Sequence, residues 1–212
     1  MHQAKSQATH PDSKTARTSA GRLRRVWRAA HEPVPGVPTW ARRAAYAVPL
    51  VVLPSSVWRL GVIFGDDKRG GMLPDWAMDG YVVLLSVLSE LLAFTAIGLI
   101  ARWGEVFPRW VPILRGRRVP TAAAAVPAAI GATVLTLMWT AIGVLTEVTQ
   151  TKLNGDPLPD DFPSRAGGWE SAYYYVSYAP LVLWGPLLAA VTIAYLRRRR
   201  SAAPGRLAAT AG

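Results

Sequence analysis

Two charged side chains, Arg59 and Glu90, lie within otherwise apolar stretches of the sequence. A charge in the hydrocarbon core of a membrane is costly, so such residues pair with each other or mark a proton or substrate pathway. At 1.5 Å of helix per residue, Arg59 lies about 9 Å and Glu90 about 13 Å from the ends of their spans on the same side. That difference is smaller than the reach of an arginine side chain. We therefore expect an intramembrane charge pair between Arg59 and Glu90.

Other catalytic chemistry has few candidates in this chain. It contains no cysteine, and its three histidines, His2, His10 and His31, all precede the first apolar block. This composition excludes a thiolate nucleophile, a Cys-ligated metal, and a haem or zinc held by membrane-embedded histidine. We find no recognisable Ser-Lys pairing either. We therefore expect no cofactor and rank a membrane-embedded enzyme below the other functions.

The acidic segment 147–171 carries three aspartates of the kind that bind cations: Asp156, Asp160 and Asp161. Their spacing does not match the twelve-residue EF-hand loop, and the prolines between them stiffen the segment. The sequence therefore predicts no metal site. It leaves open whether this loop contacts a partner or an ion.

The elements that position Arg59 and Glu90 are long apolar segments. The stretch from Tyr81 to Arg102 holds about 20 nearly uninterrupted apolar residues, enough to cover roughly 30 Å of hydrocarbon as a helix. Three other segments repeat this pattern, which predicts four spans, at about 44–65, 81–100, 121–146 and 172–196. The fold class is thus all-α, an integral membrane bundle of four transmembrane helices within residues 44–196.

Small and polar side chains recur at helical spacing in two of the predicted spans. In the second span they predict the face that packs inward, and they are Ser86, Ser89, Glu90, Ala93 and Ala96. In the third span they predict close contact with another helix, and they are Thr133, Thr136, Thr140 and Gly143. Such residues let helix backbones approach each other in membranes. A polar pathway along the third span is the alternative interpretation.

Basic residues alternate along the chain. The N-terminal segment 1–43 has nine Lys and Arg, the loops 66–80, 101–120 and 147–171 have two, five and two, and the C-terminal segment 197–212 has five. The positive-inside rule then predicts cytoplasmic N- and C-termini in the cell membrane. We expect residues 1–43 to be a basic, disordered tail with a proline-rich linker, and 197–212 a second basic tail. The net charge of +11 arises mainly beside the spans, which favours anionic lipid headgroups over nucleic acid as the partner.

The loop 101–120 mixes aromatic and basic side chains. Five of them are candidates for contact with lipid headgroups: Trp103, Arg109, Trp110, Arg117 and Arg118. Such a segment lies in the headgroup layer, with aromatic rings shallowly buried and arginines near lipid phosphate. A site for a phosphate-bearing substrate is the alternative, because arginine binds phosphate in a bidentate manner.

Three short sequences in this loop carry a family resemblance: Trp103-Gly104-Glu105, Pro108-Arg109-Trp110-Val111-Pro112 and Gly116-Arg117-Arg118-Val119-Pro120. They resemble a segment of uncharacterised multi-pass membrane proteins of high-GC actinobacteria. The resemblance implies a common membrane architecture, and no activity comes with it. It also makes Glu105, Arg109 and Arg117 candidates for an ordered interfacial structure.

These patterns favour a polytopic inner-membrane protein with a structural or accessory function and an Arg59–Glu90 pair. The alternative is a small proton-coupled transporter, or a subunit of one, that uses Glu90, since an intramembrane carboxylate is the usual element of such proteins. The expected partner is a bilayer with anionic headgroups. The sequence leaves open a homo-oligomer or a membrane partner protein.

Overall fold

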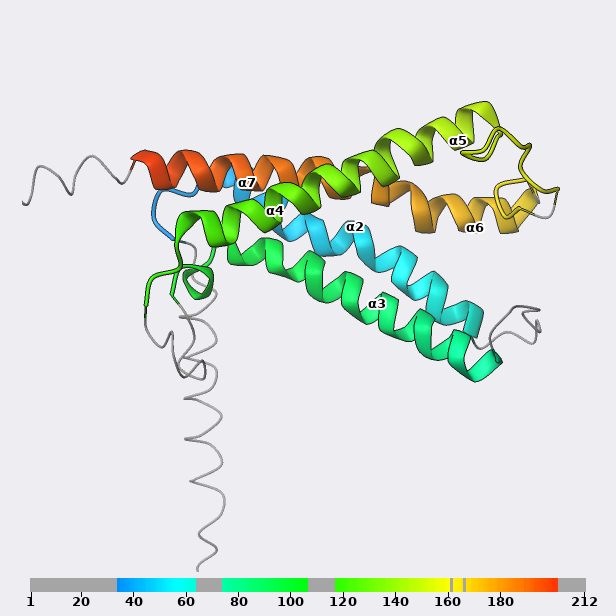
Figure 1. Cartoon of the computed structure of the whole chain (residues 1–212), viewed down its shortest axis with the longest axis horizontal. Coiled ribbons are helices and arrows are strands. Elements are labelled where there is room, and N and C mark those ends of the chain that lie inside the picture. Colours follow the sequence, from blue (N-terminus) through cyan, green and yellow to red (C-terminus); the bar gives the residue numbers. More distant parts are fainter. Residues whose placement is uncertain (1–33, 64–73, 107–116, 161, 166, 202–212) are drawn as a thin grey trace, which may run out of the picture.

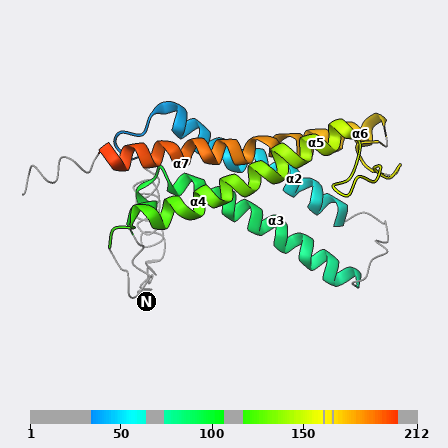
Figure 2. The same ribbon diagram turned by 45° about the horizontal axis from the view of Figure 1, so that its top comes forward.

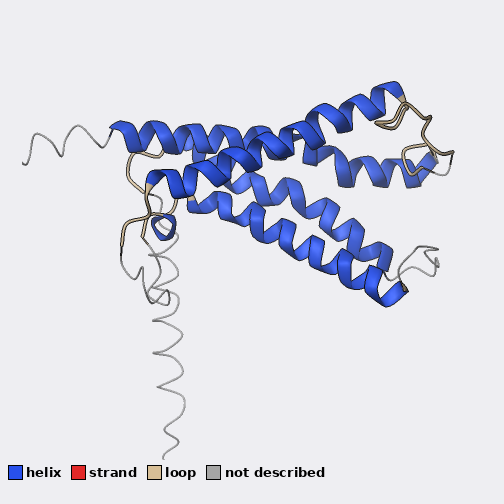
Figure 3. Ribbon diagram, viewed as in Figure 1, coloured by secondary structure: helices blue, strands red, loops and turns tan. Residues whose placement is uncertain are grey.

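The protein folds as a bundle of four long helical spans, confirming the predicted all-α class (Figure 1). The computed structural model describes residues 34–63, 74–106, 117–160, 162–165 and 167–201. Figure 3 shows these residues as helices joined by loops. Each span is long and apolar enough to cross a membrane, so the chain is a multi-pass membrane protein. Residues 1–33 and 202–212 of the predicted tails, and residues 107–116 of loop 101–120, lie outside the described residues.

The first two spans are single helices. Helix α2 spans Thr39–Ile63, and helix α3 spans Asp75–Gly98. Both begin several residues before the predicted spans, because the chain is already helical at the membrane interface. A short 3₁₀ turn, η1 (Arg102–Gly104), follows α3 and leads into the loop before the third span.

The last two spans each contain a segment that is not α-helical. The third consists of α4 (Thr121–Leu135), a π-helix η2 (Thr136–Gly143) and α5 (Val144–Thr149). The fourth consists of α6 (Gly168–Tyr178), a 3₁₀ segment η3 (Ala179–Leu183) and α7 (Trp184–Ser201).

The spans pack as two pairs that share one end. Helix α2 packs against α3 and α7, and α4 packs against α7. The pairs lie together at the end of the bundle that carries η1 and Ser201, the last residue of α7. From there the α2–α3 pair diverges from the pair formed by the third and fourth spans, as Figures 1 and 2 show. The bundle is therefore closed at the η1 end and splayed at the other.

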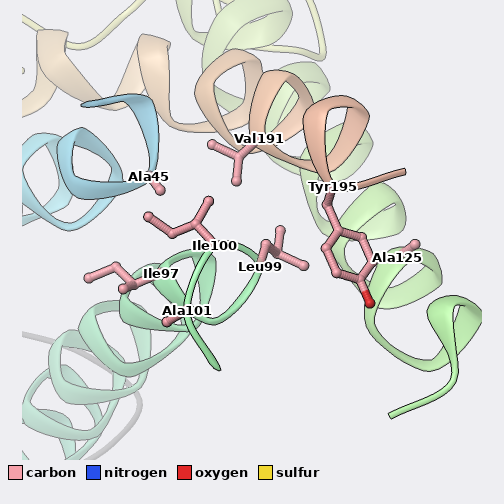
Figure 4. Packing of buried hydrophobic residues seen from close by; sticks show 8 residues of the cluster. All are labelled: Ala45, Ile97, Leu99, Ile100, Ala101, Ala125, Val191 and Tyr195. Carbon is pink, nitrogen blue, oxygen red and sulfur yellow. The ribbon is translucent and has the colours of Figure 1, made fainter. Parts of the chain in front are cut away.

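Small side chains allow this closed end to form. One buried cluster joins residues from all four spans, and Figure 4 shows its members: Ala45, Ile97, Leu99, Ile100, Ala101, Ala125, Val191 and Tyr195. A second cluster lies next to it, formed by Val48, Val52, Ala93, Ala96, Leu181 and Trp184. Three of the alanines, Ala45, Ala93 and Ala96, are at most 1% exposed, so the helix backbones approach closely there.

The inward face predicted for the second span is confirmed. Ser86, Ser89, Ala93 and Ala96 are buried, and Glu90 is half-buried. The large side chains on the rest of α3, such as Leu84 and Leu91, are exposed, as expected for a surface that faces lipid tails.

The threonine pattern of the third span contacts the fourth span where both depart from α-helical geometry. Thr140 Oγ1 donates a 2.7 Å hydrogen bond to the carbonyl oxygen of Val182. Gly185 lies directly against Thr136, so a side chain there would collide with the Thr136 backbone. Thr133 is exposed and bonds to Ala129 of its own helix. The predicted close packing is thus confirmed for two of the threonines and not for Thr133.

Candidate functional site

The intramembrane charges meet between α2 and α3, at a group of serines. Arg59 lies in the last turns of α2 and donates from Nη2 to the hydroxyls of Ser55 and Ser56, each at 3.4 Å. The spacing of three and four residues puts these side chains on one face of the helix. Ser55 and Ser56 are buried, so this polar group lies within the bundle.

Glu90 reaches the same group from the other helix. The Ser56 hydroxyl and the charge of Arg59 both act on its carboxylate. Ser56, which accepts a hydrogen bond from Arg59, is therefore a neighbour of both charges. Two buried atoms, Arg59 Nε and Glu90 Oε1, have no hydrogen-bond partner among the described residues. Direct pairing of Arg59 with Glu90 stays a prediction, and the described contacts place Ser56 beside both residues.

Aromatic rings cover this group on the side of the fourth span. Trp58, next to Arg59, makes edge contacts with Tyr178 and Tyr174, with centroid distances of 5.1 and 6.4 Å. The Tyr174 and Tyr178 rings stack at 5.0 Å. The charge of Arg59 also acts on the Tyr178 phenol. The arginine is thus surrounded by hydroxyl and aromatic groups from α2 and α6.

The five predicted headgroup residues have different environments. Arg117 and Arg118 are exposed, and the backbone of Arg118 pairs with Val106. The half-buried ring of Trp103 packs on Gly98 and stacks on Phe94 at 6.3 Å. Arg109 and Trp110 lie outside the described residues. The structure therefore gives Trp103 a packing contact that the sequence did not predict.

Two arginines that the sequence presented as topological signals form a partly buried polar site. Arg198 donates from Nη2 to Glu105 Oε1 at 2.8 Å and to the Leu99 carbonyl at 3.2 Å. The Arg198 and Glu105 side chains are 11% and 24% exposed. Arg198 thereby satisfies a carbonyl at the end of α3 that no helical partner can reach. Glu105, the one acidic residue of loop 101–120, was the sequence signal for this contact.

Arg199 extends this site to the start of α4. It donates to the Val119 carbonyl at 2.8 Å and to Thr121 Oγ1 at 3.1 Å. Both arginines also contact the ring of Tyr195, with guanidinium-to-centroid distances of 5.6 and 5.7 Å. Together Arg198 and Arg199, which we call the arginine clamp, hold the two described ends of loop 101–120 against α7.

The aspartates of the acidic loop are engaged with neighbouring side chains. Asp160 forms an ion pair with Arg165 at 3.1 Å, and Asp156 accepts from Asn154 at 2.6 Å. Asp161 lies outside the described residues. Within the described part of the chain, no three His, Cys, Asp or Glu residues gather as a metal site would require.

Comparisons with models of protein families, with curated proteins and with solved structures found no match. The fold and its sites are therefore interpreted from this chain alone. What they show is a polytopic membrane protein with four apolar spans, an arginine and a glutamate beside Ser56 between α2 and α3, and an arginine clamp at the closed end.

Proposed function

We propose that this chain is a structural or accessory protein of the cell membrane, in which Arg59, Ser56 and Glu90 fasten α2 to α3. The observation that carries this proposal is that the intramembrane charges of two helices both lie beside one buried serine, Ser56. A charge that is stabilised by contacts across a helix interface holds that interface together, because separating the helices would leave it unpaired in hydrocarbon.

The contacts at the closed end support the same proposal. The arginine clamp joins α7 to loop 101–120, and the Val34 amide bonds to the Ile100 carbonyl at 3.0 Å. Three chain segments far apart in sequence are therefore fixed to one another. A rigid end of this kind suits a protein that presents its tails and loops to a membrane partner or to a second copy.

We also propose that both termini and loop 101–120 are cytoplasmic. The excess of Lys and Arg in these segments supports this orientation, and their described parts meet at one end of the bundle. In that orientation Arg117 and Arg118 lie near the anionic headgroups of the inner leaflet, and we place Arg109 and Trp110 in the same layer.

One observation favours a second candidate, a proton-coupled transporter that uses Glu90. Glu90 Oε1 is buried without a hydrogen-bond partner among the described residues, so this atom is available to accept a proton. An intramembrane carboxylate that gains and loses a proton is the central element of such transporters.

Thermal unfolding in detergent tests the fastening function. We expect Glu90→Gln to lower the unfolding midpoint more than the double variant Arg59→Leu with Glu90→Leu, because the single change leaves the arginine charge without its partner. Arg42→Gln, at an exposed arginine of α2, is the control for loss of a charge. Equal loss of stability in the single and double variants would contradict the pairing.

Proton flux in proteoliposomes separates the two candidates. A fastening role predicts no pH-driven flux above that of empty vesicles for the wild-type protein. Flux that is present in the wild type and lost in a stably folded Glu90→Gln variant would replace our proposal with the transporter.

A further inference from the structure

A cavity of about 590 Å³ lies between α3 and α4, on a face of α3 different from that of Glu90. Leu92 and Thr95 of α3 form one wall, and Trp184 and Leu188 of α7 line it as well. Trp103 of η1 lines it at the closed end of the bundle. The lining is almost wholly apolar, and the volume is within the range of roughly 300–1,000 Å³ that is typical of ligand pockets.

The sequence of α4 explains why the space is open. Four of the residues that α4 turns toward the cavity are small or cyclic: Ala124, Pro127, Ala128 and Gly131. Val134 and Leu135 line the cavity only at the end of this helix. Small residues usually bring membrane helices into contact. Here, among the described residues, α3 approaches α2 closely and α4 approaches α7, but α3 and α4 are not a closely packed pair. The missing side-chain volume is therefore left as a gap between two spans.

An occupant of this gap has to be apolar. If the gap were empty, the side chains that line it would lose dispersion contacts. Water would not fill it well, because an apolar lining offers water too few hydrogen bonds. Exposed residues such as Leu92 line the gap, so it opens sideways at the depth of the bilayer. The molecules that surround the protein at this depth are lipid acyl chains.

Charge at the closed end indicates which lipid would fit. The turn that carries Trp103 begins with Arg102, and the exposed Arg117 and Arg118 lie just before α4. An anionic phospholipid has a net negative headgroup, whereas the phosphate of a zwitterionic lipid is offset by the lipid's own ammonium group. The anionic headgroup is therefore attracted more strongly to these arginines.

We propose that the cavity between α3 and α4 binds one acyl chain of an anionic phospholipid from the leaflet on the side of η1, with the headgroup near Arg117 and Arg118. The bound chain then serves as the packing element that the small residues of α4 do not supply. This inference stands apart from the fastening of α2 to α3, since it involves a different face of α3.

Native mass spectrometry of the full chain tests the site. The protein in mild detergent is given phosphatidylglycerol and phosphatidylcholine at equal concentration, and the retained lipid is measured. We expect one phosphatidylglycerol per chain in the wild type. Leu92→Trp fills the cavity and should reduce retention severalfold, whereas Leu91→Trp, at an exposed residue outside the lining, should not.

A second pair of variants guards against a folding defect on α3. Ala128→Leu fills the cavity from α4, and Ala123→Leu is its control at an exposed position of the same helix. Arg117→Gln with Arg118→Gln should erase the preference for phosphatidylglycerol, and Arg42→Gln with Arg43→Gln should keep it.

Three outcomes would overturn the proposal. Retention that is unchanged in both cavity-filling variants would place the lipid elsewhere. Equal retention of the two lipids by the wild type would contradict the proposed preference for an anionic headgroup. A dimer that Leu92→Trp and Ala128→Leu convert to a monomer, while their controls do not, would make a second copy of the chain the occupant.

Discussion

The hydroxyl of Thr140 donates its hydrogen bond to the Val182 carbonyl oxygen, at 2.7 Å across two spans. In an α-helix that carbonyl would accept from residue 186, which is a proline and has no amide hydrogen. The threonine of the π-helical segment therefore satisfies an acceptor that the proline of the neighbouring span leaves open. Two local departures from α-helical geometry thus stabilise each other.

Replacing Thr140 tests this relationship. Thr140→Val keeps the shape and removes the donor, so we expect a loss of about 1 kcal/mol in the free energy of unfolding. Thr133→Val is the matched control, because the exposed Thr133 bonds within its own helix. The loss should shrink when Pro186→Ala restores an amide donor. An unchanged loss in that background would show that the bond does not compensate for the proline.

Gly185 should tolerate no side chain. A Cβ atom at Gly185 would collide with the backbone of Thr136, so Gly185→Ala forces the third and fourth spans apart. We expect a loss of about 1–3 kcal/mol, as for other overpacked sites. Gly80→Ala on α3 is the control, because open space surrounds that position. Thermal unfolding in one detergent measures both, and equal midpoints would contradict the close contact.

The arginine clamp should hold the two described ends of loop 101–120 in place. Arg198→Gln removes the ion pair with Glu105, and we expect a cost of about 1–3 kcal/mol, since hydrogen bonds between charged groups in partly buried sites have this value. Hydrogen exchange should become faster in residues 99–106. Arg200→Gln, at an exposed arginine of the same helix end, should leave exchange there unchanged. Equal exchange in both variants would show that Arg198 does not hold the loop.

The proposed orientation can be measured with single cysteines, because the chain has none of its own. The thiol of Asn154→Cys should react with a membrane-impermeant maleimide on intact cells. The thiol of Ser201→Cys should react only after the cells are lysed. Both positions are exposed, so access to the protein surface is not limiting. The reverse pattern of labelling would invert the topology.

The four spans and the inward face of α3 follow from the sequence because both depend on local patterns. Twenty apolar residues are long enough to span a bilayer whatever the rest of the chain does, and the serines and alanines of α3 repeat at the helical period. The arginine clamp does not follow in the same way. Glu105 and Arg198 are 93 residues apart, and their contact exists because α7 brings them to one end of the bundle.

Neither the position of Ser56 beside both charges nor the cavity could be predicted from the sequence. The sequence placed Arg59 and Glu90 at compatible depths, but the rotation of α2 against α3 decides that Ser56 lies between them. The sequence predicted contact with another helix from the threonine pattern of the third span, and made no prediction for Ala124, Pro127, Ala128 and Gly131. That they leave a gap toward α3 depends on the angle at which the two helix pairs diverge, which no single segment encodes.

The role of α7 at the closed end has a consequence for how the protein is made. This helix packs against α2 and α4 and holds the described ends of loop 101–120, yet it leaves the ribosome after the other three spans. The α2–α3 hairpin and α4 enter the membrane before the element that joins them exists. Packing of these four spans against one another is therefore completed only after α7 has been synthesised.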